Sequence, residues 1–154
     1  MRPVLQSTLL ASVVAMIALA ARGGDSGPDG NAPGIPKLTG KIIEADSGLR
    51  YIDEIAGNGV APQQGQVVVA HYTGWLTDGA KFDSSRDKDQ AYAFRIGVGA
   101  VIAGWDEGLA TMKSGGKRRL IVPPDLAYGD AARPGIPPGS TLIFDVELLE
   151  VQQN

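Results

Sequence analysis

The sequence predicts an α+β fold in which an antiparallel sheet wraps around one short helix as a half-barrel. Alternating β-branched, aromatic and polar residues predict strands in several short segments between residues 47 and 151. Apolar residues at the helical period occur in one segment, near residues 101–112. About 110 residues with this pattern can enclose one hydrophobic core.

The first two strands are expected at residues 47–55 and 67–75. The second is rich in β-branched and aromatic residues, and an Asn-Gly turn signal lies between the two segments. Because successive side chains of a strand point to opposite faces, Val68, Ala70 and Tyr72 share one face.

Four later segments complete the predicted sheet. Residues 81–83 begin a short edge strand, and alternating aromatic and aliphatic side chains predict a strand at residues 92–96. The last two strands are expected at residues 117–122 and 141–151, with the even-numbered apolar residues of the latter on one side.

The helix is predicted from an apolar stripe. Val101, Trp105, Leu109 and Met112 are separated by four, four and three positions, which places them on one helical face. A Gly-Gly pair follows, as is usual at a helix C-terminus. This stripe is expected to pack against the apolar face of the sheet and to leave a pocket at the open end.

Composition excludes several classes of function. The chain of 154 residues has a net charge of -3, and its longest basic run is residues 117–119, so nucleic acid is not an expected partner. It has no cysteine and one histidine, His71, which excludes thiol chemistry and a histidine-pair metal site. No metal or cofactor is therefore expected.

The N-terminus has the pattern of a targeting segment. Residues 1–20 predict a signal peptide: Arg2 precedes an apolar run at residues 9–20 that ends in a small-x-small pattern. Export to the periplasm or secretion is the expected localisation, with an uncleaved membrane anchor as the alternative. Residues 21–37 are rich in Gly, Pro and Asp and are expected to be a flexible linker before a domain at residues 38–154.

Aromatic residues gather in the predicted elements. Ordinary core packing would explain any one of them, but together they favour an aromatic cup that is open at one end. No nucleophile elbow or phosphate-binding loop accompanies them. Seven of the nine aromatic residues (2 Trp, 4 Tyr, 3 Phe) lie at inner positions or ends of these elements: Tyr72, Phe82, Tyr92, Phe94, Trp105, Tyr128 and Phe144.

Six sequence blocks, in order, resemble the FKBP family of peptidyl-prolyl cis-trans isomerases, in a bacterial, exported form. The similarity covers residues 47–151 and implies a five-stranded antiparallel half-barrel around a short helix. The blocks are VAHYTG (69–74), GAKFDSS (79–85), VIAGWDEGL (101–109), AYG (127–129), IPP (136–138) and LIFDVELL (142–149).

The resemblance also implies the residues of the site. Trp105 would form the pocket floor, the backbone N–H of Ile102 would donate to a substrate carbonyl, and Ile136 would cover the pocket. Lys88 stands where many relatives have an arginine, so a bidentate clamp on Asp83 is not expected. The implied catalytic residues are Tyr72, Phe82, Asp83, Trp105, Tyr128 and Phe144. The implied substrate-binding residues are Tyr92, Phe94, Val101, Ile102 and Ile136.

The implied activity is acceleration of rotation about X-Pro bonds in an apolar pocket, with no covalent step. The expected partners are proline-containing unfolded or partly folded proteins, together with macrolide ligands, and the chain is expected to be a monomer. Two alternatives are a non-catalytic chaperone module that holds proline-containing segments and a hydrolase that uses His71 or Asp83.

Overall fold

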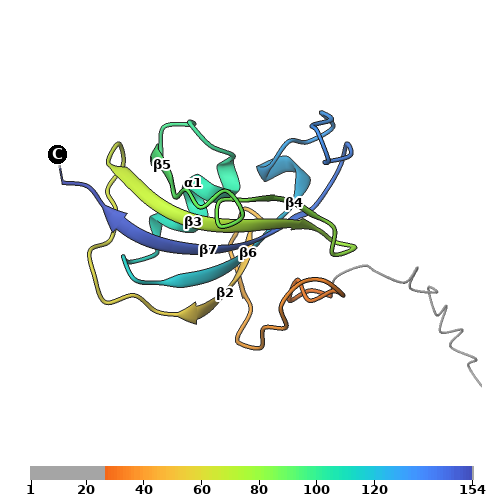
Figure 1. The fold of residues 1–154 in the computed structure, drawn as a ribbon, viewed down its shortest axis with the longest axis horizontal. Coiled ribbons are helices and arrows are strands. Elements are labelled where there is room, and N and C mark those ends of the chain that lie inside the picture. Colours follow the sequence, from red (N-terminus) through yellow and green to blue (C-terminus); the bar gives the residue numbers. More distant parts are fainter. Residues whose placement is uncertain (1–26, 154) are drawn as a thin grey trace, which may run out of the picture.

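The computed structural model describes residues 27–153, which form one antiparallel sheet and one α-helix (Figure 1). The sheet runs in the order β1-β2-β6-β7-β3-β4, and β5 also pairs with β3. The helix α1 spans Ala103–Ala110, and a short 3-10 helix, η1, spans Pro124–Leu126. The strands are β1 (Ile43–Glu44), β2 (Arg50–Ile55), β3 (Val67–Leu76), β4 (Lys81–Ser84), β5 (Tyr92–Arg95), β6 (Lys117–Val122) and β7 (Leu142–Val151).

The predicted fold class is confirmed, and the sheet has seven strands where five were expected. The difference arises at the edges of the sheet. One half of β3 pairs with β4 and the other half with β5, and the two-residue β1 extends the opposite edge. The sequence predicts the segments of β4 and β5, at residues 81–83 and 92–96, whereas the two-residue β1 is too short for alternation to identify it.

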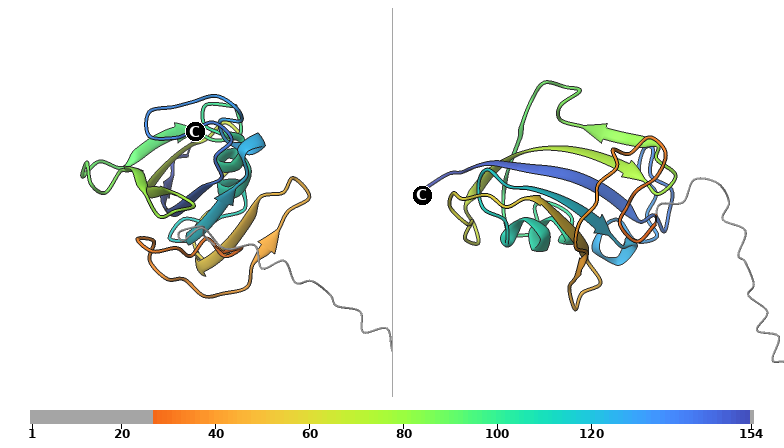
Figure 2. Two further views of the ribbon diagram at one scale, coloured as in Figure 1. Left: turned by 90° about the vertical axis from the view of Figure 1, so that its right-hand side faces the viewer. Right: turned by 90° about the horizontal axis from the view of Figure 1, so that it is seen from below.

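The helix lies against the concave face of the sheet, which curves over it (Figure 2). Val101 and Met112, which belong to the predicted stripe, lie just outside α1, and Trp105 and Leu109 provide its buried face. A Cβ atom on Gly104 would lie 2.4 Å from the Val122 side chain. Because glycine lacks that atom, α1 can approach β6 closely. This close approach sets the distance between Trp105, the next residue of α1, and the sheet.

One end of the opposite face of the sheet is covered by residues 27–38, which we call the N-terminal strap (orange in Figures 1 and 2). Ile35 of the strap is 6% exposed and forms a second apolar cluster with Trp75 and Ile143. The expectation of a flexible linker at residues 21–37 is therefore wrong for residues 27–37. The predicted signal peptide and residues 21–26 lie outside the described residues.

A buried arginine explains why so polar a segment is ordered. Arg119 is 1% exposed, and its guanidinium binds both Asp145 carboxylate oxygens at 2.7 and 2.9 Å. Its remaining donors reach the strap, at 2.8 Å to Asn31 Oδ1 and 2.7 Å to the Pro36 carbonyl. A buried charge is tolerated only when its donors are satisfied, so the strap belongs to the folded domain.

Candidate functional site

A cavity of about 280 Å³ opens beside Trp105, between the helix and the sheet. Nine of the eleven residues predicted from the sequence line it, and Ala100 is an addition that sequence reasoning missed. Phe94 is buried behind Tyr92, with ring centroids 5.5 Å apart, and Ile136 lines a neighbouring depression. The lining consists of Tyr72, Phe82, Asp83, Tyr92, Ala100, Val101, Ile102, Trp105, Tyr128 and Phe144.

The floor of the cavity is a cluster of aromatic rings centred on Trp105, which is 4% exposed. Its ring meets Tyr72 at 5.0 Å and Phe144 at 5.3 Å, both in edge-to-face geometry. Phe82 packs edge-on against Phe144 at 5.6 Å and extends the cluster towards the rim. Such edge-to-face packing fixes ring orientation, so the cup is held in shape before any ligand enters.

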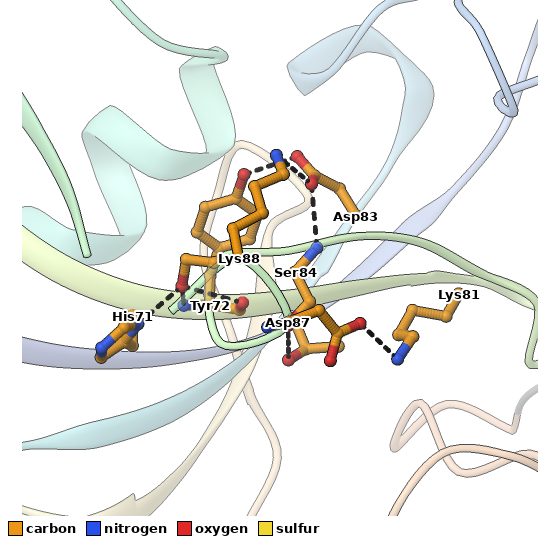
Figure 3. A network of polar contacts seen from close by, with 9 residues as sticks. His71, Tyr72, Lys81, Asp83, Ser84, Asp87 and Lys88 are labelled. Carbon is orange, nitrogen blue, oxygen red and sulfur yellow. Dashed lines mark hydrogen bonds and ion pairs between the residues drawn. The ribbon is translucent and has the colours of Figure 1, made fainter. Parts of the chain in front are cut away.

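The rim carries one carboxylate in a fixed position, Asp83 (Figure 3). The Tyr72 hydroxyl donates to Asp83 Oδ2 at 2.5 Å, and the Ser84 N–H donates to Oδ1 at 2.9 Å. Lys88 Nζ lies 2.8 Å from Oδ1. Lys88 therefore holds Asp83 through a single contact, in line with the expectation that no bidentate clamp forms here.

These contacts set the protonation states of the rim. Burial acts to raise the pKa of Asp83, but hydrogen bonds from Lys88 and Tyr72, with the Lys88 charge, outweigh it and lower that pKa. Burial, followed by the hydrogen bond to Asp83, raises the pKa of Tyr72. At neutral pH the pair is thus a carboxylate acceptor and a phenol donor.

The lowered pKa of Asp83 predicts the pH below which the proposed activity should fall. A depressed pKa means that the charged form of Asp83 is stabilised above the ordinary aspartate pKa and is lost as the pH falls through the lowered value. With an uncharged peptide, activity should stay constant down to about pH 4 and fall only below it. Asp83→Asn should lack this acid limb in a pH profile measured from pH 3 to 7 on folded protein. A decline that begins near pH 6 and disappears in Asp83→Asn would contradict the assignment.

His71 belongs to a structural network and not to the cavity. Its Nδ1 lies 2.8 Å from the hydroxyl of Ser85, which also accepts the Tyr72 backbone N–H at 2.8 Å (Figure 3). Ser85 is 2% exposed, so a substrate carbonyl cannot reach this hydroxyl. The arrangement disfavours a hydrolase and anchors the start of the loop after β4. Sequence reasoning missed Ser85, because no local pattern marks a serine that pairs across strands.

The half-barrel and its aromatic cup define a small domain that can enclose one apolar group. A family model for FKBP-type peptidyl-prolyl cis-trans isomerases matches residues 59–149. Since that match covers more than half of the chain, the chain belongs to this family, which confirms the resemblance of the six sequence blocks to FKBP-type isomerases.

Individual relatives support the same assignment. The chain is 52% identical to peptidyl-prolyl cis-trans isomerase Fkbp12 of Drosophila melanogaster over 107 residues, which cover 68% of this chain and 99% of that protein. It is 50% identical to FkpA of Escherichia coli (strain K12) over 111 residues, covering 72% of this chain and 40% of that protein. The chain thus spans less than half the length of some curated relatives and nearly all of others.

Solved structures agree in fold. The crystal structure of FkpA from Escherichia coli matches with a TM-score of 0.69 and 48% identity, covering 75% of this chain and 53% of that one. The crystal structure of AtFKBP13 matches with a TM-score of 0.69 and 43% identity, covering 73% of this chain and 99% of that one.

Proposed function

We propose that this chain accelerates rotation about X-Pro peptide bonds in folding client proteins, and that its aromatic pocket does so without a covalent step. The observation that carries the proposal is a rigid cup of aromatic rings around Trp105 with one fixed carboxylate, Asp83, at its rim. An apolar cup of this kind suits a proline ring, which carries no hydrogen-bond donor.

The reaction needs no nucleophile. The barrier to rotation about a peptide bond is about 18–20 kcal/mol, because the planar amide has partial double-bond character. The twisted transition state has lost that resonance and is less polar than the planar amide. A water-poor cavity therefore favours the twisted form relative to the planar one. A reduction of about 5 kcal/mol would accelerate rotation by nearly four powers of ten.

Polar groups at the rim would hold the substrate as it turns. Tyr72, Tyr92 and Tyr128 all line the cavity, and the hydroxyl of Tyr72 is engaged by Asp83. Of the other two phenols, Tyr128 shares the rim with Asp83 and would face a substrate carbonyl. Ile102 lines the cavity and precedes α1. Its backbone N–H would donate to a second substrate carbonyl, across the proline from the one that faces Tyr128. Asp83 and Tyr72 together keep this edge of the cup in place.

A peptide assay tests the proposal against a non-catalytic binding module. A peptide whose cis X-Pro isomer relaxes slowly should reach equilibrium faster in the presence of micromolar protein. Binding of the peptide without any acceleration would establish the chaperone module that holds proline-containing segments.

The same cavity is proposed to accept macrolides of the FK506 kind. Support comes from relatives with that name: the chain is 50% identical to the FK506-binding protein of Neisseria meningitidis serogroup B over 107 residues. In a Trp75→Phe variant, in which Trp105 is the remaining tryptophan, quenching of tryptophan fluorescence during titration with FK506 would report occupancy at the floor of the cavity.

Export is proposed on the basis of the signal-like pattern in residues 1–20. Among the described residues, no helix is long and apolar enough to cross a membrane. Mass spectrometry of the protein from its host distinguishes cleavage after Ala20 from an intact N-terminus. A chain that begins at Ala21 supports export and release, and an intact Met1 in the cytosol would contradict it.

A further inference from the structure

A second depression, of about 340 Å³, adjoins the aromatic cup on the side of the loop before β7. It shares three lining residues with the cup, so the two hollows are continuous along one wall. A peptide whose proline occupies the cup continues on both sides of the proline, and a residue next to the proline can lie over this depression. The depression is lined by Phe82, Asp83, Tyr128, Arg133, Pro134 and Ile136.

Arg133 is held at the edge of this depression. Its backbone N–H donates to the Ile136 carbonyl at 3.0 Å, and the Ile136 N–H returns a bond to the Arg133 carbonyl at 2.9 Å. Ile136 is buried and fastens this tight loop to the domain. The Arg133 guanidinium lies 5.0 Å from the centre of the Tyr128 ring, within the range of a cation–π contact.

The positive charge of Arg133 is not neutralised by the protein. Within residues 27–153, no carboxylate forms an ion pair with its guanidinium. Asp83, the acidic residue of the same depression, already accepts from Lys88, Tyr72 and Ser84. The depression beside the cup therefore presents a cation with unused hydrogen-bond donors to whatever residue of a substrate lies there.

We infer that Arg133 is a specificity-determining residue that favours substrates with an acidic side chain next to the proline. A Glu or Asp over the depression can form an ion pair with the guanidinium, whereas a Lys at the same place meets a like charge. This inference rests on the proposed isomerase function and names the class of X-Pro segment that the site prefers.

The test uses peptides that differ only in the residue before or after the proline, which is Glu, Gln or Lys. An exposed ion pair contributes little, so kcat/KM for the Glu peptide should exceed that for the Gln peptide by about two- to fivefold at low salt. The preference should hold for one of the two flanking positions and weaken in 0.5 M salt, because exposed charges are screened.

The matched variants are Arg133→Gln and Arg95→Gln. Arg95 is an exposed arginine on β5 whose side chain donates to the Gly65 carbonyl, and it lines neither the aromatic cup nor the adjoining depression. In Arg133→Gln the Glu-to-Gln ratio of kcat/KM should fall to about one, while Arg95→Gln should keep the ratio of the unchanged protein.

Two results would overturn the inference: equal kcat/KM for Glu and Gln peptides at both positions in the unchanged protein, or a preference that persists in Arg133→Gln. Neither result is confused with failure of the proposed function, because turnover of the Gln peptide by the unchanged protein reports isomerase activity by itself.

Discussion

Replacement of Phe82 by alanine is expected to lower kcat/KM for X-Pro isomerisation by about 10- to 100-fold. The Phe82 ring forms one wall of the cup and packs edge-on against Phe144 at 5.6 Å. Burying a side chain of this size is worth about 1.5–3 kcal/mol, and each 1.36 kcal/mol changes a rate about tenfold. Without the ring, water enters the cup and the preference for the less polar, twisted amide weakens.

The backbone around Phe82 indicates that this loss should appear mainly in activity. Phe82 is half-buried on β4, and the register of β4 against β3 is set by the Thr73–Ser84 and Gly74–Asp83 pairs, which the substitution leaves in place. A Cβ atom on Gly74 would lie 2.6 Å from the Phe82 ring, so the ring lies directly over that glycine. Thermal unfolding of the variant should confirm that the fold is retained.

Lys88→Ala provides the matched control. The Lys88 side chain is 63% exposed and touches the site through one contact to Asp83, so its loss should change kcat/KM by less than about threefold. Both variants are compared in the same proline-limited peptide assay. Equal losses in Phe82→Ala and Lys88→Ala would show that the apolar wall is not what accelerates rotation.

Replacement of Asn31 by alanine is expected to destabilise the domain by about 2–4 kcal/mol, because it leaves a buried charge short of a partner. The Asn31 Oδ1 atom accepts from Arg119 at 2.8 Å and from the Leu38 N–H at 2.9 Å. Its amide nitrogen donates to the Leu38 carbonyl at 2.8 Å. One side chain therefore closes the strap on itself and binds it to Arg119.

The measurement is the free energy of unfolding in urea, for the full chain and its variants. Asn58→Ala is the matched control, because Asn58 is exposed in the turn after β2, and its loss should change the free energy by less than about 0.5 kcal/mol. An Asn31→Ala protein as stable as the Asn58→Ala protein would show that the strap does not stabilise the sheet.

Much of the candidate site could be predicted because it rests on local periodicity. Alternation in β3 and β7 places Tyr72 and Phe144 on the face of the sheet that packs against the helix. The four-residue separation of Val101, Trp105 and Leu109 places Trp105 on the face of the helix that contacts those two rings. The FKBP resemblance then supplied the roles, which neither spacing nor composition could assign.

What the sequence by itself determined is therefore the antiparallel half-barrel, its one helix and the residues of the aromatic cup. Only the tertiary structure decided that the strap packs on the sheet and that Arg133 lies over Tyr128 beside the cup. The physical reason is the separation of these contacts along the chain. Asn31 and Arg119 are 88 residues apart, and no periodic pattern links them. The buried guanidinium of Arg119 needs acceptors, and the strap provides two of them, so a segment that resembles a linker in the sequence is packed on the sheet.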